Sequence, residues 1–89
     1  MQSADYIEKL KYLYGDNLEK LDPLDRYGLI SFLAFALNRQ MYPVAVMAQH
    51  EDIFGLLVPT EVRGTFYHCP PLLLPNVIKF LSESLPASW

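Results

Sequence analysis

Hydrophobic residues recur at three- and four-residue spacing near the start of the chain. Ile7, Leu10 and Tyr14 follow this spacing, and the charged residues between them fall on the other side. Such a pattern is typical of an amphipathic helix. Gly15 is the residue type expected just past a helix C-terminus. We therefore predict a helix over about residues 4–14.

A longer apolar segment follows a clear helix start. Asp22 is a favoured N-cap residue, and Pro23 fits the first helical position. From Leu29 to Leu37, apolar side chains point almost all the way round a helix, so neighbouring elements should cover it on most sides. We predict a helix over about residues 23–39 and expect it to be the hub of the fold.

The C-terminal part of the chain also has helical spacing. Pro75 can occupy a first helical turn, and Pro86 ends the pattern. The apolar stripe between them consists of Val77, Ile78, Leu81 and Leu85. We predict a third helix over about residues 74–85.

Helical spacing weakens between Met41 and Cys69. Three short apolar runs rich in Val, Ile, Phe and Tyr are separated by polar clusters, which is typical of short strands in a meander. The runs are MYPVAVMA, DIFGLLVP and RGTFYHC. The same segment contains good helix formers, and Pro43 also fits a first helical turn, so periodicity alone leaves a helical interpretation open.

The element order predicts an α+β domain. It consists of two N-terminal helices, a short three-stranded antiparallel meander and a C-terminal helix, with the helices on one face of the sheet. The alternative is a small all-α helical bundle. A chain of 89 residues has room for one core, so we expect a single domain over residues 1–89, with 86–89 as a flexible tail.

Composition and charge narrow the classes of function. The chain is 52% hydrophobic and 13% aromatic, which is more apolar surface than so small a domain can bury, and the excess predicts an interface. A net charge of -3 with no run of basic residues argues against nucleic-acid binding. The longest apolar run is about half of the roughly 20 residues that a membrane helix needs, so we expect no membrane binding either.

The cysteine content and the N-terminal sequence indicate the cellular compartment of the protein. Cys69 is the single cysteine and cannot form an internal disulfide, whereas small secreted domains often carry several. The first residues lack the basic segment and apolar core of a secretory signal. We therefore expect a cytoplasmic protein.

Five residues are candidates for chemistry: His50, Glu51, Asp52, His68 and Cys69. They suggest a zinc site or a histidine-activated thiol. However, their spacing matches neither H-E-x-x-H nor C-x-x-C, and neighbours on a strand point to opposite faces. Free cysteines usually behave as small buried hydrophobes. We expect the histidines to lie in solvent-facing turns, and we predict no metal and no cofactor.

The proline-rich segment CPPLLLP suggests an exposed apolar surface. Prolines on both sides of three leucines disfavour a continuous helix, so some of these leucines should face solvent. We expect them to join neighbouring aromatic residues in an apolar patch ringed by acids. The predicted partner-binding residues are Tyr42, Tyr67, Leu72, Leu73, Leu74 and Trp89.

Apolar excess without a catalytic motif favours a non-enzymatic interaction protein. We expect an adaptor, assembly factor or inhibitor that acts through this patch on another protein. One alternative is a small metal- or thiol-dependent enzyme that uses the His50, Glu51 and Asp52 group with His68 and Cys69. The other is a homodimer whose interface accounts for the apolar excess.

Overall fold

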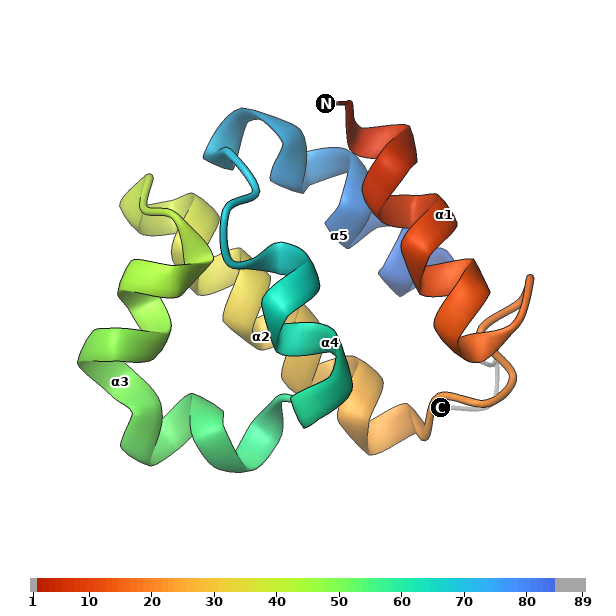
Figure 1. The fold of residues 1–89 in the computed structure, drawn as a ribbon, viewed down its shortest axis with the longest axis horizontal. Coiled ribbons are helices and arrows are strands. Elements are labelled where there is room, and N and C mark those ends of the chain that lie inside the picture. The colour runs from red at the N-terminus through yellow and green to blue at the C-terminus, as the bar shows by residue number, and fades with distance from the viewer. Residues whose placement is uncertain (1, 85–89) are drawn as a thin grey trace.

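A computed structural model describes residues 2–84, and all the regular structure in this part of the chain is helical (Figure 1). The elements are α1 (Ser3–Tyr14), α2 (Pro23–Arg39), α3 (Pro43–Leu57), α4 (Thr60–Phe66), the short 3-10 helix η1 (Pro71–Leu73) and α5 (Leu74–Glu83).

The predictions of the first, second and last helices are confirmed. Helix α1 ends at Gly15, whose φ of 95° is readily adopted only by glycine. At the start of α2, the Asp22 side chain accepts a hydrogen bond from the amide of Leu24 at 2.9 Å. Helix α5 begins at Leu74 with Pro75 in its first turn.

The predicted meander over residues 41–69 is wrong, and so is the α+β class. Within residues 2–84 the chain forms α3 and α4 in this region and no strand, so the fold is all-α, as in the alternative interpretation. Helix α3 buries Val46, Met47 and Phe54 on one side, and α4 buries Val62 and Phe66, which are four residues apart. Burial of these helical faces outweighs the β propensity of the residue types.

Helix α3 is kinked at His50, whose backbone angles (φ −132°, ψ 35°) are not helical. The two halves of α3 therefore have different axes, and α3 contacts α2. The His50 ring meets the Phe35 ring edge-on at 5.1 Å between centroids, and the Phe54 ring lies 5.4 Å from the rings of Phe32 and Phe35. The kink lies within the polar residues 49–52, which separate two apolar runs of the sequence.

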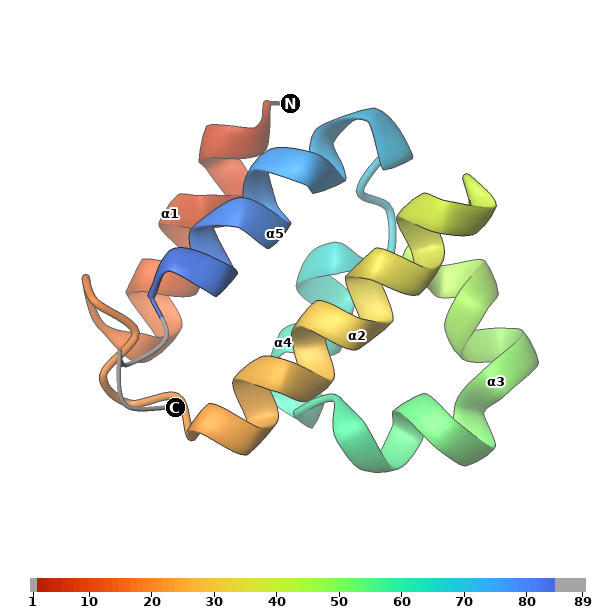
Figure 2. The same ribbon diagram turned by 180° about the vertical axis from the view of Figure 1, so that it is seen from behind.

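Helix α2 contacts α3 along one side and α5 along the other, while α1 contacts α5 and α4. Seen from behind, α2 and α5 lie in front of α1 and α4, so the helices form two layers with α3 at one edge (Figure 2). One hydrophobic cluster fills the space between the layers. Its largest fully buried side chains include Leu10, Leu18, Leu29, Phe32, Leu33, Phe66, Leu74 and Leu81.

A buried arginine joins the loop after α1 to the end of α5. Arg26 is only 4% exposed. Its guanidinium donates to the carbonyls of Leu18 at 2.6 Å, Leu21 at 3.1 Å and Ser84. The Leu18 backbone is left-handed (φ 54°), which turns this loop back toward α2. Among the described atoms, the Nε of Arg26 has no hydrogen-bond partner.

None of the helices within residues 2–84 combines the length and hydropathy that crossing a bilayer requires.

Candidate functional site

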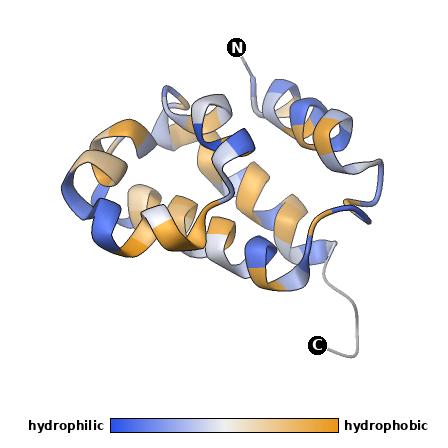
Figure 3. Cartoon of the chain, turned by 60° about the horizontal axis from the view of Figure 1, so that its bottom comes forward, coloured by the Kyte–Doolittle hydropathy of each residue, from blue (hydrophilic) through white to orange (hydrophobic). Residues whose placement is uncertain are grey.

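Most of the exposed large hydrophobic side chains lie where α2 begins and α3 ends. Of nine such side chains among the described residues, five belong to these two segments. They are Leu24, Tyr27, Ile53, Leu56 and Leu57, and we call them the α2–α3 surface. Figure 3 turns the bottom of Figure 1 forward and shows hydrophobic residues on the ribbons nearest the viewer.

A close backbone contact brings the two segments together. Gly28 of α2 lies against the end of α3, where a Cβ at Gly28 would be 2.2 Å from the carbonyl oxygen of Leu57. Leu24 is one turn before Gly28 on the same side of α2, and Ile53 is one turn before Leu57 on α3. The exposed Leu57 therefore lies beside the first turns of α2, whereas Ile53, next to Phe54 in the sequence, lies farther along it toward Phe32 and Phe35.

The part of α2 beside this contact has an uncharged exposed stripe. Leu24, Tyr27, Ser31 and Ala34 are all exposed and follow one another at spacings of three, four and three residues. This spacing places them on one face of the helix. Helix α2 contacts α3, α5 and η1, and the four residues of this stripe remain exposed.

Charged residues of both signs lie beside the α2–α3 surface, because Arg63 donates to the carbonyls of Val58 and Gly55 at the end of α3. Asp22 caps α2 two residues before Leu24, and Asp52 is exposed on α3 one turn before Leu56. All four lysines lie elsewhere, on α1, in the loop after it and on α5: Lys9, Lys11, Lys20 and Lys79.

The partner-binding residues predicted from the sequence fall in different environments. Tyr42 is 48% exposed and Leu72 is 87% exposed, whereas Tyr67 and Leu73 are partly buried. Leu74 is fully buried in the core, so its predicted exposure is wrong. It starts α5 and packs inward because the chain re-enters a helix directly after η1. Trp89 and the predicted tail, 86–89, lie outside the described residues.

Two members of this predicted patch, Tyr67 and Leu72, line different hollows. The Tyr67 carbonyl accepts a hydrogen bond from the Val44 amide at 3.0 Å, which ties the end of α4 to the start of α3 beside Tyr42. Val44 and Tyr67 line one hollow of about 220 Å³. Leu72 lines a different one, also of about 220 Å³, with Leu37.

The five candidates for chemistry do not converge. His50, Glu51 and Asp52 lie within α3, so their predicted position in a turn is wrong, and His50 is partly buried against Phe35. His68 is exposed just after α4, and the prediction that Cys69 is buried is confirmed. Within residues 2–84, no three His, Cys, Asp or Glu side chains are grouped so that they could hold a metal ion.

The surroundings of Cys69 favour the protonated thiol. Burial raises the pKa of Cys69, and a hydrogen bond with Tyr6 only partly opposes this effect. The thiol also approaches the carbonyl oxygen of Pro70 at 3.7 Å. Because the thiolate is the nucleophilic form, this position is poorly suited to covalent catalysis.

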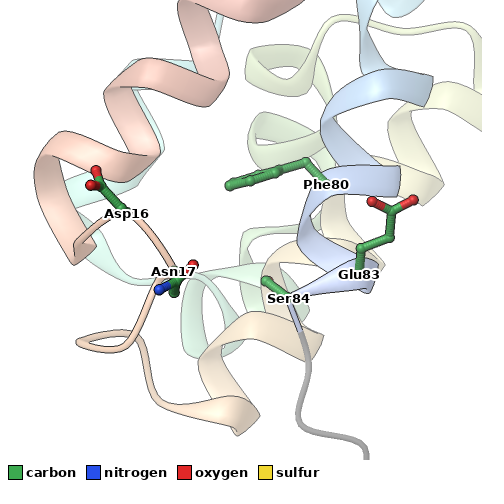
Figure 4. Close-up of a pocket in the computed structure, with 5 residues that line it drawn as sticks. All are labelled: Asp16, Asn17, Phe80, Glu83 and Ser84. Carbon is green, nitrogen blue, oxygen red and sulfur yellow. The ribbon is translucent and has the colours of Figure 1, made fainter.

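A separate pocket lies between the end of α1 and the end of α5. It has a volume of about 320 Å³ and is lined by Asp16, Asn17, Phe80, Glu83 and Ser84 (Figure 4). The Phe80 ring lies between the two helices, and the carboxylates of Asp16 and Glu83 do not point toward each other (Figure 4). Glu83 instead pairs with Lys79 at 3.9 Å. This geometry lacks the two facing carboxyl groups that most glycoside hydrolases use.

In comparisons with protein-family models, curated proteins and solved structures, the chain has no significant match.

Sequence reasoning missed all five residues of the α2–α3 surface. The available indication was in α2 itself, where apolar residues on nearly every side predicted that neighbouring elements cover it on most sides. Leu24 and Tyr27 on this helix are instead exposed, at 69% and 39%. Ile53, Leu56 and Leu57 were assigned to a strand, and an alternating strand pattern cannot place all three on a common face.

Proposed function

We propose that this chain is a non-enzymatic protein–protein interaction module of the cytoplasm, such as an adaptor, assembly factor or inhibitor, and that it binds through the α2–α3 surface. The observation that carries the proposal is the gathering of five exposed hydrophobic side chains where α2 begins and α3 ends. Large exposed apolar patches on small domains usually mark interfaces.

Burial of these side chains by a partner would supply affinity. Leu56 is 89% exposed, and full burial of a leucine contributes about 1.5–3 kcal/mol. Leu24 and Ile53 are also more than half exposed. Interfaces commonly depend on a few such anchors surrounded by weaker contacts. Three exposed anchors of this kind support a specific complex.

Leu72 provides a matched control for Leu56. Both are leucines, and their exposures, 87% and 89%, are nearly equal, but they lie on different parts of the molecule. We expect a purified partner, first obtained by affinity capture and then reconstituted with this chain, to lose at least about tenfold in affinity with Leu56→Ser. Leu72→Ser should change the affinity by less than about twofold.

The opposite result would identify the other surface. If Leu72→Ser abolishes binding and Leu56→Ser does not, the partner contacts the leucine segment predicted from the sequence. If both variants bind as well as the wild type, the proposal that the α2–α3 surface is the interface is wrong.

The thiol-enzyme alternative has its own measurement. An activated Cys69 would react with a disulfide reagent faster than an unfolded cysteine does, because its thiolate would be populated at neutral pH. We expect slower reaction in the native protein than in urea, since burial raises the Cys69 pKa and restricts access. Faster native reaction would favour the enzyme hypothesis over the interaction module.

A further inference from the structure

We propose that the hollow between α1 and the end of α4 binds a small, flat apolar molecule that carries one carboxylate. The hollow has a volume of about 420 Å³, and small-molecule sites commonly measure about 300–1,000 Å³. It is lined by Tyr6, Lys9, Gly64, Thr65, His68 and Pro70. None of these residues belongs to the α2–α3 surface, so the inference goes beyond the proposed function and does not depend on it.

Apolar ring surface, fixed in place, lines the inner part of the hollow. Tyr6 is only 4% exposed. Its ring stacks on the Phe66 ring at 5.7 Å between centroids, and its hydroxyl is hydrogen-bonded with the Cys69 thiol. Thr65 and Pro70, which also line the hollow, are half-buried. Because these side chains are already ordered, a flat ligand that packs against them costs little further conformational entropy.

Gly64 keeps the hollow open within helix α4. A Cβ at Gly64 would meet nothing within 4 Å, and its backbone is not left-handed, unlike that of Gly15. Neither a close contact nor the backbone conformation therefore requires glycine at this position, although glycine inside a helix is less stable than alanine. The space beside Gly64 is available to a ligand, and a ligand seated there would account for the absence of a side chain.

The charged side chain that lines the hollow is a cation. The Lys9 ammonium lies 5.7 Å from the centroid of the Tyr6 ring. Among the described residues no carboxylate forms an ion pair with it, and the neighbouring Glu8 pairs with Lys11 at 3.8 Å. His68 is exposed at the rim, and its imidazole has an N–H donor in either protonation state. An ammonium beside apolar ring surface suits a carboxylate attached to an apolar body.

Two further acids nearby limit the charge that the ligand can carry. Asp5, one turn before Lys9, accepts a hydrogen bond from the Gln2 amide at 2.7 Å, and Glu61, at the start of α4, accepts one from the Tyr14 hydroxyl at 3.0 Å. Because these donors are neutral, both carboxylates stay anionic. The preference for an anion therefore rests on direct contact with Lys9, and a second negative charge on the ligand, as on a phosphate, is disfavoured.

Three small probes with the same naphthalene ring provide the experiment: a naphthoate, its neutral amide and a naphthyl phosphate. Binding to the intact chain is followed by the shifts of backbone amide signals in NMR titrations. We expect the naphthoate to bind with a Kd of about 1 mM, the affinity typical of a ligand of this size. It should bind at least about threefold more tightly than either of the other probes. The largest shifts should belong to Gly64, Thr65 and His68.

Matched variants locate the binding site. Lys9→Met should weaken the naphthoate by at least about threefold and change the affinity of the amide by less than about twofold. Lys20→Met is the control, because Lys20 is exposed in the loop after α1 and does not line the hollow. Gly64→Leu should weaken all three probes by at least about tenfold, since its side chain fills the hollow. The variant should unfold in urea at the same or a higher concentration than the wild type, because leucine favours the helix.

Four outcomes would overturn the inference. The first is no saturable shift at naphthoate concentrations of about ten times the expected Kd. The second is wild-type affinity in a folded Gly64→Leu variant. The third is equal or tighter binding of the amide or the phosphate. The fourth is a set of shifts centred on the α2–α3 surface and lost with Leu56→Ser. None of these results bears on the proposed function, which the reconstituted partner complex tests separately.

Discussion

Gly28 in α2 and Leu57 at the end of α3 are in direct main-chain contact. A Cβ atom added at Gly28 would lie 2.2 Å from the Leu57 carbonyl oxygen and 3.0 Å from its carbonyl carbon. These distances are too short for any side chain. Glycine at this position therefore determines how closely α3 approaches α2, and it sets the arrangement of the exposed side chains on both helices.

Gly28→Ala is expected to destabilise the protein by about 1–3 kcal/mol, because α3 must move away to admit the methyl group. The free energy of unfolding in urea measures this effect. Gly64 in α4 is the control, since a Cβ there would meet nothing within 4 Å. Gly64→Ala should be neutral or stabilising by up to about 1 kcal/mol. Similar losses in both variants would contradict the close contact.

Removal of the Arg26 side chain is expected to lower the free energy of unfolding by about 2–4 kcal/mol. Arg26→Met keeps much of the apolar stem but leaves the carbonyls of Leu18, Leu21 and Ser84 without their donor. Arg39→Met is the matched control, because Arg39 is exposed and its described contact is with the Phe35 ring. It should cost less than about 1 kcal/mol. Equal costs would show that the carbonyl contacts of Arg26 contribute little.

The leucines of CPPLLLP are expected to differ sharply in their contribution to stability. Leu74→Ala should cost about 2–5 kcal/mol, because the side chain is fully buried and its removal leaves a cavity. Leu72→Ala should change the free energy of unfolding by no more than about 0.5 kcal/mol, since this side chain is 87% exposed. Urea unfolding of the two variants measures both changes in the free energy of unfolding. A large loss with Leu72→Ala would contradict the described placement of η1.

Alkaline pH is expected to destabilise the protein partly through Tyr14. Burial, followed by a hydrogen bond from the Tyr14 hydroxyl to Glu61 at 3.0 Å, raises the pKa of Tyr14 above its ordinary value of 10.0. In the unfolded chain, Tyr14 ionises near its ordinary pKa. The stabilisation is therefore complete below about pH 10 and is lost as pH rises through the folded-state pKa.

The loss of stability above about pH 10 should be shallower in Tyr14→Phe than in the wild type. Urea unfolding between pH 7 and pH 11 measures this slope. Tyr12→Phe is the control, because Tyr12 is exposed on the same helix. Burial also raises the pKa of Tyr6, so part of the slope should remain in Tyr14→Phe. Parallel curves for Tyr14→Phe and the wild type would contradict this contribution of Tyr14.

The helices with strong terminal residues could be predicted from the sequence. Asp22 and Pro23 mark the start of α2, and Gly15 marks the end of α1, because capping and proline geometry act locally. The start of α3 has a similar proline, Pro43, but the polar residues 49–52, around the His50 kink, separate its two apolar runs. Tertiary packing against α2 stabilises α3, and single-residue propensity does not include that packing.

The candidate site was less predictable than the fold. Exposure of Leu56 depends on which side of α3 faces α2, and that side is set by the contact between Gly28 and Leu57. A glycine within an apolar helix indicates a close approach, but its sequence position does not identify the partner residue. Leu72 and Leu74 are the same residue type in the same short segment. Their environments differ because Leu72 lies in η1 and Leu74 begins α5.

The position of the four lysines determines how amine chemistry would orient the protein. They lie on α1, in the loop that follows it and on α5, while α3 lies at the other edge of the fold (Figure 1). A sensor surface or bead that couples to lysine amines would therefore hold the molecule by its α1 and α5 side. The end of α3 would face the solution in most attached molecules, accessible to whatever is passed over the surface.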